Sequence, residues 1–72
     1  MKYLIWSFEH NAWWRPNECG YTENIDEAGR YVGDDAGRIV VDSVLCQELA
    51  VWETMAKTQG PPKYDPWKGE IT

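Results

Sequence analysis

Few residues in this chain carry side chains that could support nucleophilic chemistry. His10 is the only histidine, and Cys19 and Cys46 are the only cysteines. A thiol activated by an adjacent imidazole is the one catalytic pairing that these residues could form. His10 lies between Glu9 and Asn11 in a predicted turn, however, where a solvent-exposed histidine with no catalytic role is the simpler interpretation.

Longer catalytic and ligand-binding motifs do not occur in the sequence. It has no GxSxG, HExxH, P-loop or dinucleotide-binding fingerprint. Two cysteines and one histidine do not have the spacing of a metal site. Acidic residues could in principle form an acid–base pair, but exposed acidic loops are common in proteins that are not enzymes. The sequence therefore predicts a non-enzymatic protein with no metal and no cofactor.

Acidic residues are concentrated in one part of the chain. The net charge is −5, and residues 17–35 hold six acidic residues against one base, Arg30. This balance argues against nucleic-acid binding and against anionic membrane surfaces, and it favours a protein partner with a basic surface. The alternative is a solvated region that keeps a small protein soluble. We expect the six carboxylates to form a partner-binding surface, namely Glu18, Glu23, Asp26, Glu27, Asp34 and Asp35.

The first elements that must position these residues are two predicted strands. Residues 2–8 are apolar, β-branched or aromatic and predict a strand. Residues 12–15 predict a second strand, which Pro16 ends because proline lacks a backbone N–H. Residues 9–11 form the turn between them. We therefore expect a β-hairpin, followed by a turn in which Gly20 has a positive φ angle.

Adjacent tryptophans in the second strand suggest an exposed aromatic contact. Successive strand residues point to opposite faces, so one of Trp13 and Trp14 is expected inside and the other outside. Aromatic and arginine side chains are common energetic anchors of protein interfaces. We therefore expect Trp14, beside Arg15, to contact a partner, although the pattern leaves open which of the two tryptophans is exposed.

Helical signals follow in the middle of the chain. Thr22 is expected to cap a short helical turn that Gly29 closes. Acidic residues and the apolar spacing predict a helix over residues 34–45, although Gly37 costs about 1 kcal/mol there. Residues 49–54 predict a third strand, and a helix over residues 47–57 is the alternative.

These elements predict a small single-domain α+β fold. The domain spans residues 1–58 and has an antiparallel sheet of about three strands with one helix packed on it, in ββαβ order. The proline-rich residues 59–72 are expected to form an extended C-terminal tail, which Tyr64 and Trp67 could hold against the domain. No signal peptide or membrane-spanning segment is recognisable, so we expect a cytoplasmic protein with free thiols.

One stretch resembles a set of small phage and prophage proteins with no assigned activity. The shared pattern is W-S-x-E-H-x-A-W-W-R-P-N-x-x-G-Y-T, from Trp6 to Thr22, followed by I-x-E-A-G-R-Y, from Ile25 to Tyr31. The resemblance covers residues 3–52 and implies the ββαβ order. The segment after Trp52 departs from it.

In size, charge and phage character the chain also resembles anti-CRISPR proteins. That resemblance implies an inhibitor in the host cytoplasm that mimics DNA. It would bind a basic surface, with a type I CRISPR surveillance complex as the partner, as a monomer or weak dimer. The alternative is a structural or regulatory phage protein that self-associates, or binds another protein, through its tryptophan-rich sheet.

Overall fold

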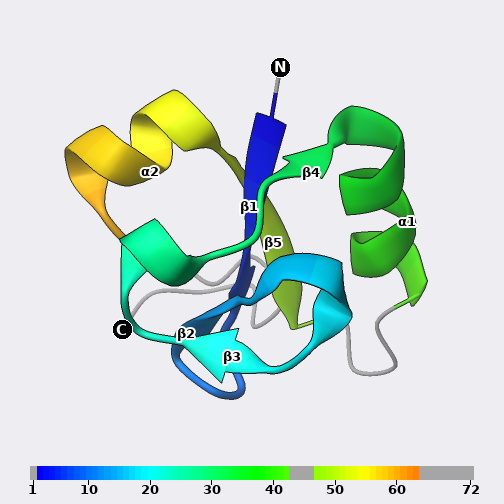
Figure 1. Ribbon diagram of the computed structural model, residues 1–72, viewed down its shortest axis with the longest axis horizontal. Helices are drawn as coiled ribbons and strands as arrows, with labels where there is room; N and C mark the ends of the chain where they lie inside the picture. Colours follow the sequence, from blue (N-terminus) through cyan, green and yellow to red (C-terminus); the bar gives the residue numbers. More distant parts are fainter. Residues whose placement is uncertain (1, 43–46, 64–72) are drawn as a thin grey trace.

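The protein is an α+β domain, as the sequence predicts, and the computed structural model describes residues 2–42 and 47–63 (Figure 1). These described residues form five strands, two α-helices and two short 3-10 helices. The strands are β1 (Lys2–Ser7), β2 (Ala12–Trp14), β3 (Tyr21–Thr22), β4 (Tyr31–Val32) and β5 (Glu48–Trp52); the helices are η1 (Pro16–Glu18), η2 (Ile25–Glu27), α1 (Gly33–Asp42) and α2 (Glu53–Gln59).

All pairs in the sheet are antiparallel, and β1 is the central strand. β5 pairs with β1 from Tyr3 to Ser7 along one edge. The other edge of β1 is shared, because β4 pairs with Lys2 and Tyr3 while β2 pairs with Trp6 and Ser7. β3 extends the sheet beyond β2.

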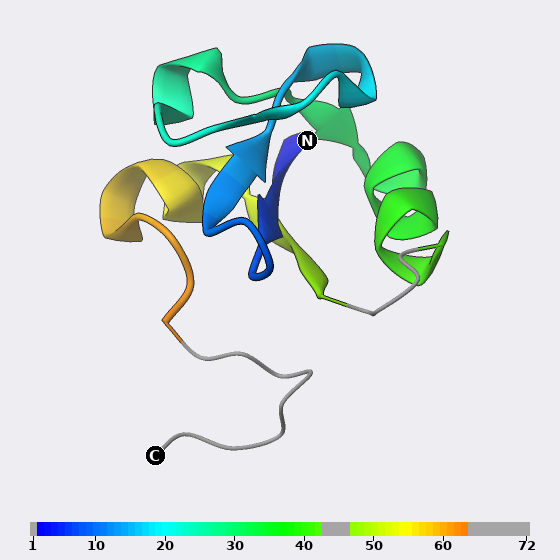
Figure 2. The same cartoon turned by 90° about the horizontal axis from the view of Figure 1, so that it is seen from below.

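Two apolar clusters lie on opposite faces of β1. Leu4 and Trp6 pack with residues that include Ala28 and Ala56 on one face, whereas Ile5 packs with α1 residues on the other. Figures 1 and 2 show α2 and η2 on one side of the strands and α1 on the other. Because β1 is covered on both faces, its sequence is a nearly continuous apolar run rather than an alternating one.

Tryptophans supply much of the first cluster. Trp6 and Trp13 face each other across the β1–β2 pair, with ring centroids 4.9 Å apart and ring planes at 72°. This edge-to-face arrangement is a favoured geometry for aromatic pairs. Trp13 is 1% exposed, so a three-residue strand is fixed in the core by a single large side chain.

The turns have the backbone conformations that their residues favour. Asn11, in the β1–β2 turn, has a φ angle of 53°, and Gly20 has the predicted positive φ, at 100°. The sequence predicts Thr22 as the N-cap of the short helix η2, but the N-cap is Asn24. The Asn24 side chain accepts the N–H of Asp26 at 2.9 Å, and the Thr22 hydroxyl accepts the N–H of Asn24 at 3.0 Å. Thr22 therefore supports the cap, which is Asn24.

The loop after β2 is held in place by Tyr31. Its hydroxyl donates to the carbonyl of Arg15 and accepts the N–H of Glu18. Asn17 and Glu18 both have φ angles near the left-handed region, at 59° and 57°, which non-glycine residues rarely adopt. Burial raises the pKa of Tyr31, as do the nearby Glu18 carboxylate and Cys19, while the Glu18 N–H lowers it.

The second half of the chain contains one helix more than predicted. The predicted helix over 34–45 is α1, which begins at Gly33 and is described to Asp42. The predicted strand over 49–54 is β5, but helix α2 follows it directly. Both interpretations of residues 47–57 were therefore partly right. Residues 43–46, with Val44 and Cys46, and residues 64–72, with Tyr64 and Trp67, lie outside the described part.

Candidate protein-binding edge

The residues around His10 do not have the geometry of a catalytic triad. The Ser7 hydroxyl lies 3.2 Å from His10 Nδ1, and the Glu9 carboxylate approaches the same nitrogen at 3.9 Å. A triad needs the hydroxyl and the carboxylate on different ring nitrogens, and a nucleophile that substrate can reach. Ser7 is fully buried. Its hydroxyl instead accepts the His10 N–H at 3.2 Å and closes the turn.

The aromatic neighbour of His10 and the Cys19 thiol also have structural roles. Its ring stacks on Tyr21 with centroids 3.9 Å apart. Partial burial raises the pKa of Tyr21, and the carboxylates of Glu48 and Glu9 raise it further. Cys19 is a free, exposed thiol, and its Sγ donates to the Asn17 carbonyl at 3.3 Å. In the described ranges no cluster of three His, Cys, Asp or Glu residues could hold a metal ion.

Two of the six predicted acidic contacts are engaged by the chain's own arginines. Glu18 accepts from Arg38 at 3.0 Å, and this hydrogen bond raises the pKa of Arg38. Glu27 accepts from Arg15 at 3.1 Å and from the Thr22 hydroxyl at 3.2 Å. These carboxylates therefore help to hold the loops that carry them, and the paired arginines offset their charges.

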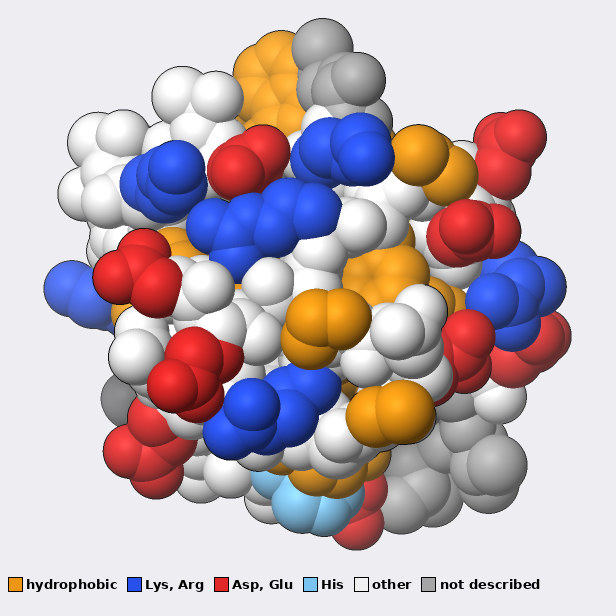
Figure 3. Space-filling view, in the orientation of Figure 1, with side chains coloured by type: hydrophobic (Ala, Val, Ile, Leu, Met, Phe, Trp, Pro, Cys, Tyr) orange, Lys and Arg blue, Asp and Glu red, His pale blue; other side chains and the backbone are white. Residues whose placement is uncertain are grey.

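The remaining four acidic residues lie on two separate elements. Glu23 and Asp26 are exposed at or next to η2, and Asp34 and Asp35 are exposed in the first turn of α1. Figures 1 and 2 place η2 and α1 on opposite sides of the sheet, and Figure 3 shows acidic groups at both sides of a face whose middle is basic and apolar. The six carboxylates therefore do not form the one continuous surface that was predicted.

Trp14 and Arg15 are not an exposed platform either. Trp13 and Trp14 do point to opposite faces, but α1 covers the second face, and Trp14 packs against the cluster around Ile5. Arg15 is held by the carbonyl of Tyr21 at 3.1 Å and by the Glu27 carboxylate. The prediction assumed a sheet with one open face, whereas both faces are covered.

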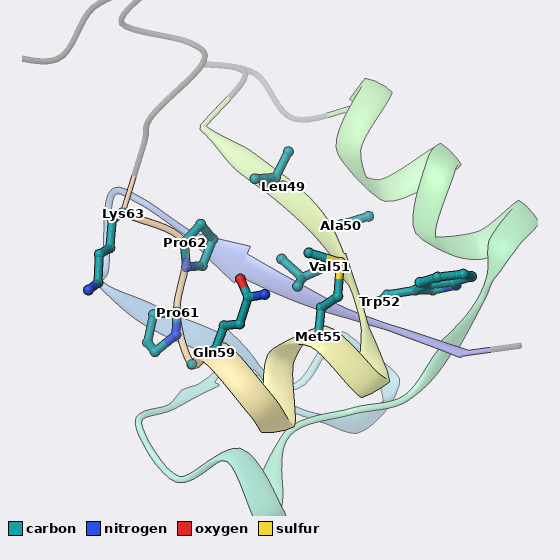
Figure 4. A pocket seen from close by; sticks show the side chains of 10 residues that line it. Leu49, Ala50, Val51, Trp52, Met55, Gln59, Pro61, Pro62 and Lys63 are labelled. Atoms are coloured by element: carbon teal, nitrogen blue, oxygen red, sulfur yellow. The ribbon is translucent and has the colours of Figure 1, made fainter.

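Among the residues that the structure describes, Trp52, at the end of β5, is the most exposed aromatic side chain. Trp52 is 43% exposed, and Met55, in the first turn of α2, is 46% exposed. A groove of about 710 Å³ lies beside them, between β5, α2 and the segment that follows α2 (Figure 4). Its lining is largely apolar and comprises Leu49, Ala50, Val51, Trp52, Met55, Gln59, Gly60, Pro61, Pro62 and Lys63.

Trp52 and Met55 also border a second hollow. It has a volume of about 400 Å³, and its other lining residues are Lys2, Glu53 and Thr54. The two side chains therefore form a ridge between two depressions. Figure 4 shows β5 between α1 and α2, with Trp52 directed toward the α1 side and Met55 on the α2 side.

One side of the β5 backbone points away from β1. Phe8 N–H donates to Gln47 C=O at 2.9 Å, in register with the β1–β5 ladder. Hydrogen-bonded pairs alternate along an antiparallel ladder, so Leu49 and Val51 direct their backbone groups to β1. Ala50 directs both of its backbone groups outward. Trp52 directs its N–H outward, while its C=O lies at the N-cap of α2. Among the described residues, β5 pairs with no strand other than β1.

Residues 49–52 lack two features that often protect an edge strand. Natural edge strands carry charged side chains, prolines or bulges, which discourage pairing with another chain. Residues 49–52 read Leu-Ala-Val-Trp and contain no charge and no proline. We use the name β5 edge for the outer side of these four residues together with Met55.

The sequence did not reveal this site because its residues fit both the spacing of a helix and the pattern of a strand. The residues Leu49, Trp52 and Ala56 share helical spacing, yet a strand ends and a helix begins at Trp52. The apolar, uncharged run 49–52 was the available signal.

No protein-family model, curated protein or solved structure matches the chain. No helix in the described part is long and apolar enough to cross a membrane.

Proposed function

We propose that this chain is a non-enzymatic protein-binding domain that makes its main contact through the β5 edge. The observation that carries the proposal is the coincidence of outward backbone groups at Ala50 with the exposed side chains of Trp52 and Met55. A strand with free N–H and C=O groups can accept an extended segment of another chain, whose alternate side chains then enter flanking pockets.

The chemistry of the groove suits such a contact. Main-chain hydrogen bonds would supply the affinity, and the apolar lining would select the side chains of the partner. Tryptophan is over-represented among the residues that dominate binding energy, because its large ring loses much solvent contact at low entropic cost. The hollows on both sides of the Trp52–Met55 ridge give a partner two places to insert side chains.

Comparison of two lysine substitutions tests the proposal. Met55→Lys places a charge at the β5 edge, whereas Val41→Lys places one on α1, where Val41 is 79% exposed. Bacterial proteins retained by the immobilised wild type should be lost with Met55→Lys and kept with Val41→Lys. Equal retention by both variants, with both folded by circular dichroism, would show that the β5 edge is not the contact.

A second candidate function is inhibition of a basic effector. Within residues 2–42 and 47–63, Glu23, Asp26, Asp34 and Asp35 form no ion pair, while Arg15, Arg30 and Arg38 are each paired with a carboxylate. Binding to a CRISPR surveillance complex remains a prediction, since it depends only on the resemblance in size, charge and phage character.

Two double variants test the exposed acidic pairs one at a time. If a basic partner is bound, Glu23→Lys with Asp26→Lys, or Asp34→Lys with Asp35→Lys, should weaken binding, and added salt should weaken the wild-type complex. Unchanged binding by both variants, and no effect of salt, would exclude this second candidate.

A further inference from the structure

We infer that the occupant of the β5 edge is a second copy of this chain, joined to the first by antiparallel pairing of the two β5 strands. The inference rests on the proposed function, because it uses the same edge. It goes further by naming the partner and the register. The two-fold axis passes beside Ala50, so that Ala50 of one copy lies opposite Ala50 of the other.

The hydrogen-bonding pattern of β5 is self-complementary about this residue. Ala50 directs both its N–H and its C=O outward, as the alternation from Phe8 and Gln47 requires. In an antiparallel pair, two opposed residues of this kind exchange two hydrogen bonds. Since a two-fold axis relates a residue to itself, Ala50 alone supplies both donors and both acceptors.

The side chains of β5 fit the same register. Leu49 of one copy comes opposite Val51 of the other, which joins two apolar residues on the face that carries the groove. Ala50 has only a methyl group at the axis. A larger side chain at this position would come close to the same side chain of the other copy. Such cross-strand apolar pairs each contribute roughly 0.2–1 kcal/mol in sheets.

Charge does not oppose this pairing at the contact. Each chain carries a net charge of −5, so two copies repel one another at long range. In this register the central pairs, over residues 49–51, are uncharged, and Glu48, which comes opposite Trp52, is only 6% exposed. The exposed carboxylates Glu23, Asp26, Asp34 and Asp35 lie at or next to η2 and on α1. The repulsion is consequently of the kind that salt screens, so the dimer should be tighter at higher ionic strength.

Sedimentation equilibrium of the purified protein tests the inference. The wild type should show a concentration-dependent monomer–dimer equilibrium that salt strengthens. Ala50→Pro removes the outward N–H and leaves those of Leu49 and Val51 in place, so its dimer should dissociate at concentrations about tenfold higher or more. Val41→Lys should dimerise as the wild type does. A wild type that stays monomeric at millimolar concentration would overturn the inference.

A cross-linking experiment covers the case in which Ala50→Pro does not fold. With Cys19 and Cys46 changed to serine, Ala50→Cys should form an intermolecular disulfide on mild oxidation, because opposed residues of an antiparallel pair lie within disulfide range. Val41→Cys in the same background is the control and should remain largely monomeric. Equal cross-linking of the two variants would contradict the proposed register.

The two proposals fail in different ways. If the protein is monomeric but retains bacterial proteins in a manner that depends on Met55, the dimer is wrong and the β5 edge binds a different chain. If Met55→Lys changes neither retention nor self-association, both proposals are wrong.

Discussion

Ala50 lies opposite Ile5 in the β1–β5 ladder, and its backbone N–H and C=O point away from Ile5 toward the outer side of the sheet. The neighbouring residue Val51 has the reverse arrangement and bonds to β1. Two adjacent residues of one strand therefore differ in the use of their backbone groups: one completes the fold, and the other is available to another chain.

Proline substitutions should distinguish these two positions. Val51→Pro removes a hydrogen bond of the ladder and leaves a β1 carbonyl without its donor, which is expected to lower the free energy of unfolding by about 1–3 kcal/mol. Ala50→Pro removes only the outward N–H, so its cost should be clearly smaller. Urea denaturation followed by tryptophan fluorescence measures both. Equal losses would mean that the edge is not oriented as described.

Glycine-to-alanine substitutions should have opposite signs at two positions. A Cβ at Gly29 would lie 2.9 Å from the Pro16 backbone and 2.8 Å from the Tyr31 ring, whereas one at Gly37 would meet nothing within 4 Å. Gly29→Ala should therefore destabilise the domain by about 1–3 kcal/mol. Gly37→Ala should stabilise α1 by about 0.5–1 kcal/mol. Thermal unfolding of the two variants checks both values, and stabilisation by Gly29→Ala would contradict the close packing at Pro16.

Tyr31 should make stability depend on pH in the alkaline range. Its folded-state pKa is raised above the ordinary value of 10.0, chiefly by burial. The unfolded chain therefore loses the phenolic proton first. The stabilisation that protonated Tyr31 gives to the fold is complete below pH 10.0 and is lost as pH rises through the folded-state pKa. Tyr31→Phe should reduce this alkaline decline, although not fully, because the pKa of Tyr21 is raised as well.

The same variant should also be less stable at neutral pH. Tyr31→Phe leaves the Arg15 carbonyl and the Glu18 N–H without their hydrogen-bond partner, which is expected to cost about 1–3 kcal/mol. Unfolding by urea at neutral and alkaline pH measures both effects. An alkaline decline of the same size in the variant and the wild type would show that Tyr31 does not cause it.

Local patterns allowed much of the fold to be predicted. The β1–β2 hairpin, the positive φ of Gly20 and helix α1 follow from strand propensity, turn residues and helical spacing, all of which act over a few residues. The boundary at Trp52 was not predictable in this way, because strand and helix signals overlap over residues 47–57. There the pairing of β5 with β1, a long-range contact, decides the outcome.

The predicted partner-binding residues depended on contacts that local patterns do not reveal. Trp14 is partly buried because α1, some 20 positions later in the sequence, packs on that face. Glu18 is neutralised by Arg38, which is also distant in sequence. Clustering along the chain indicated one acidic surface, but β4 separates η2 from α1 and carries the chain to the opposite side of the sheet.

Residue-resolved amide hydrogen exchange along β5 tests the central claim most directly. In dilute solution the N–H groups of Leu49 and Val51 should be protected, because they bond to β1, while those of Ala50 and Trp52 should exchange rapidly. At high protein concentration the Ala50 N–H should become protected too, as the edge pairs with a second copy. Protection of Ala50 in dilute solution equal to that of Val51 would show that the β5 edge is already closed, and the proposed contact would then have no free backbone to use.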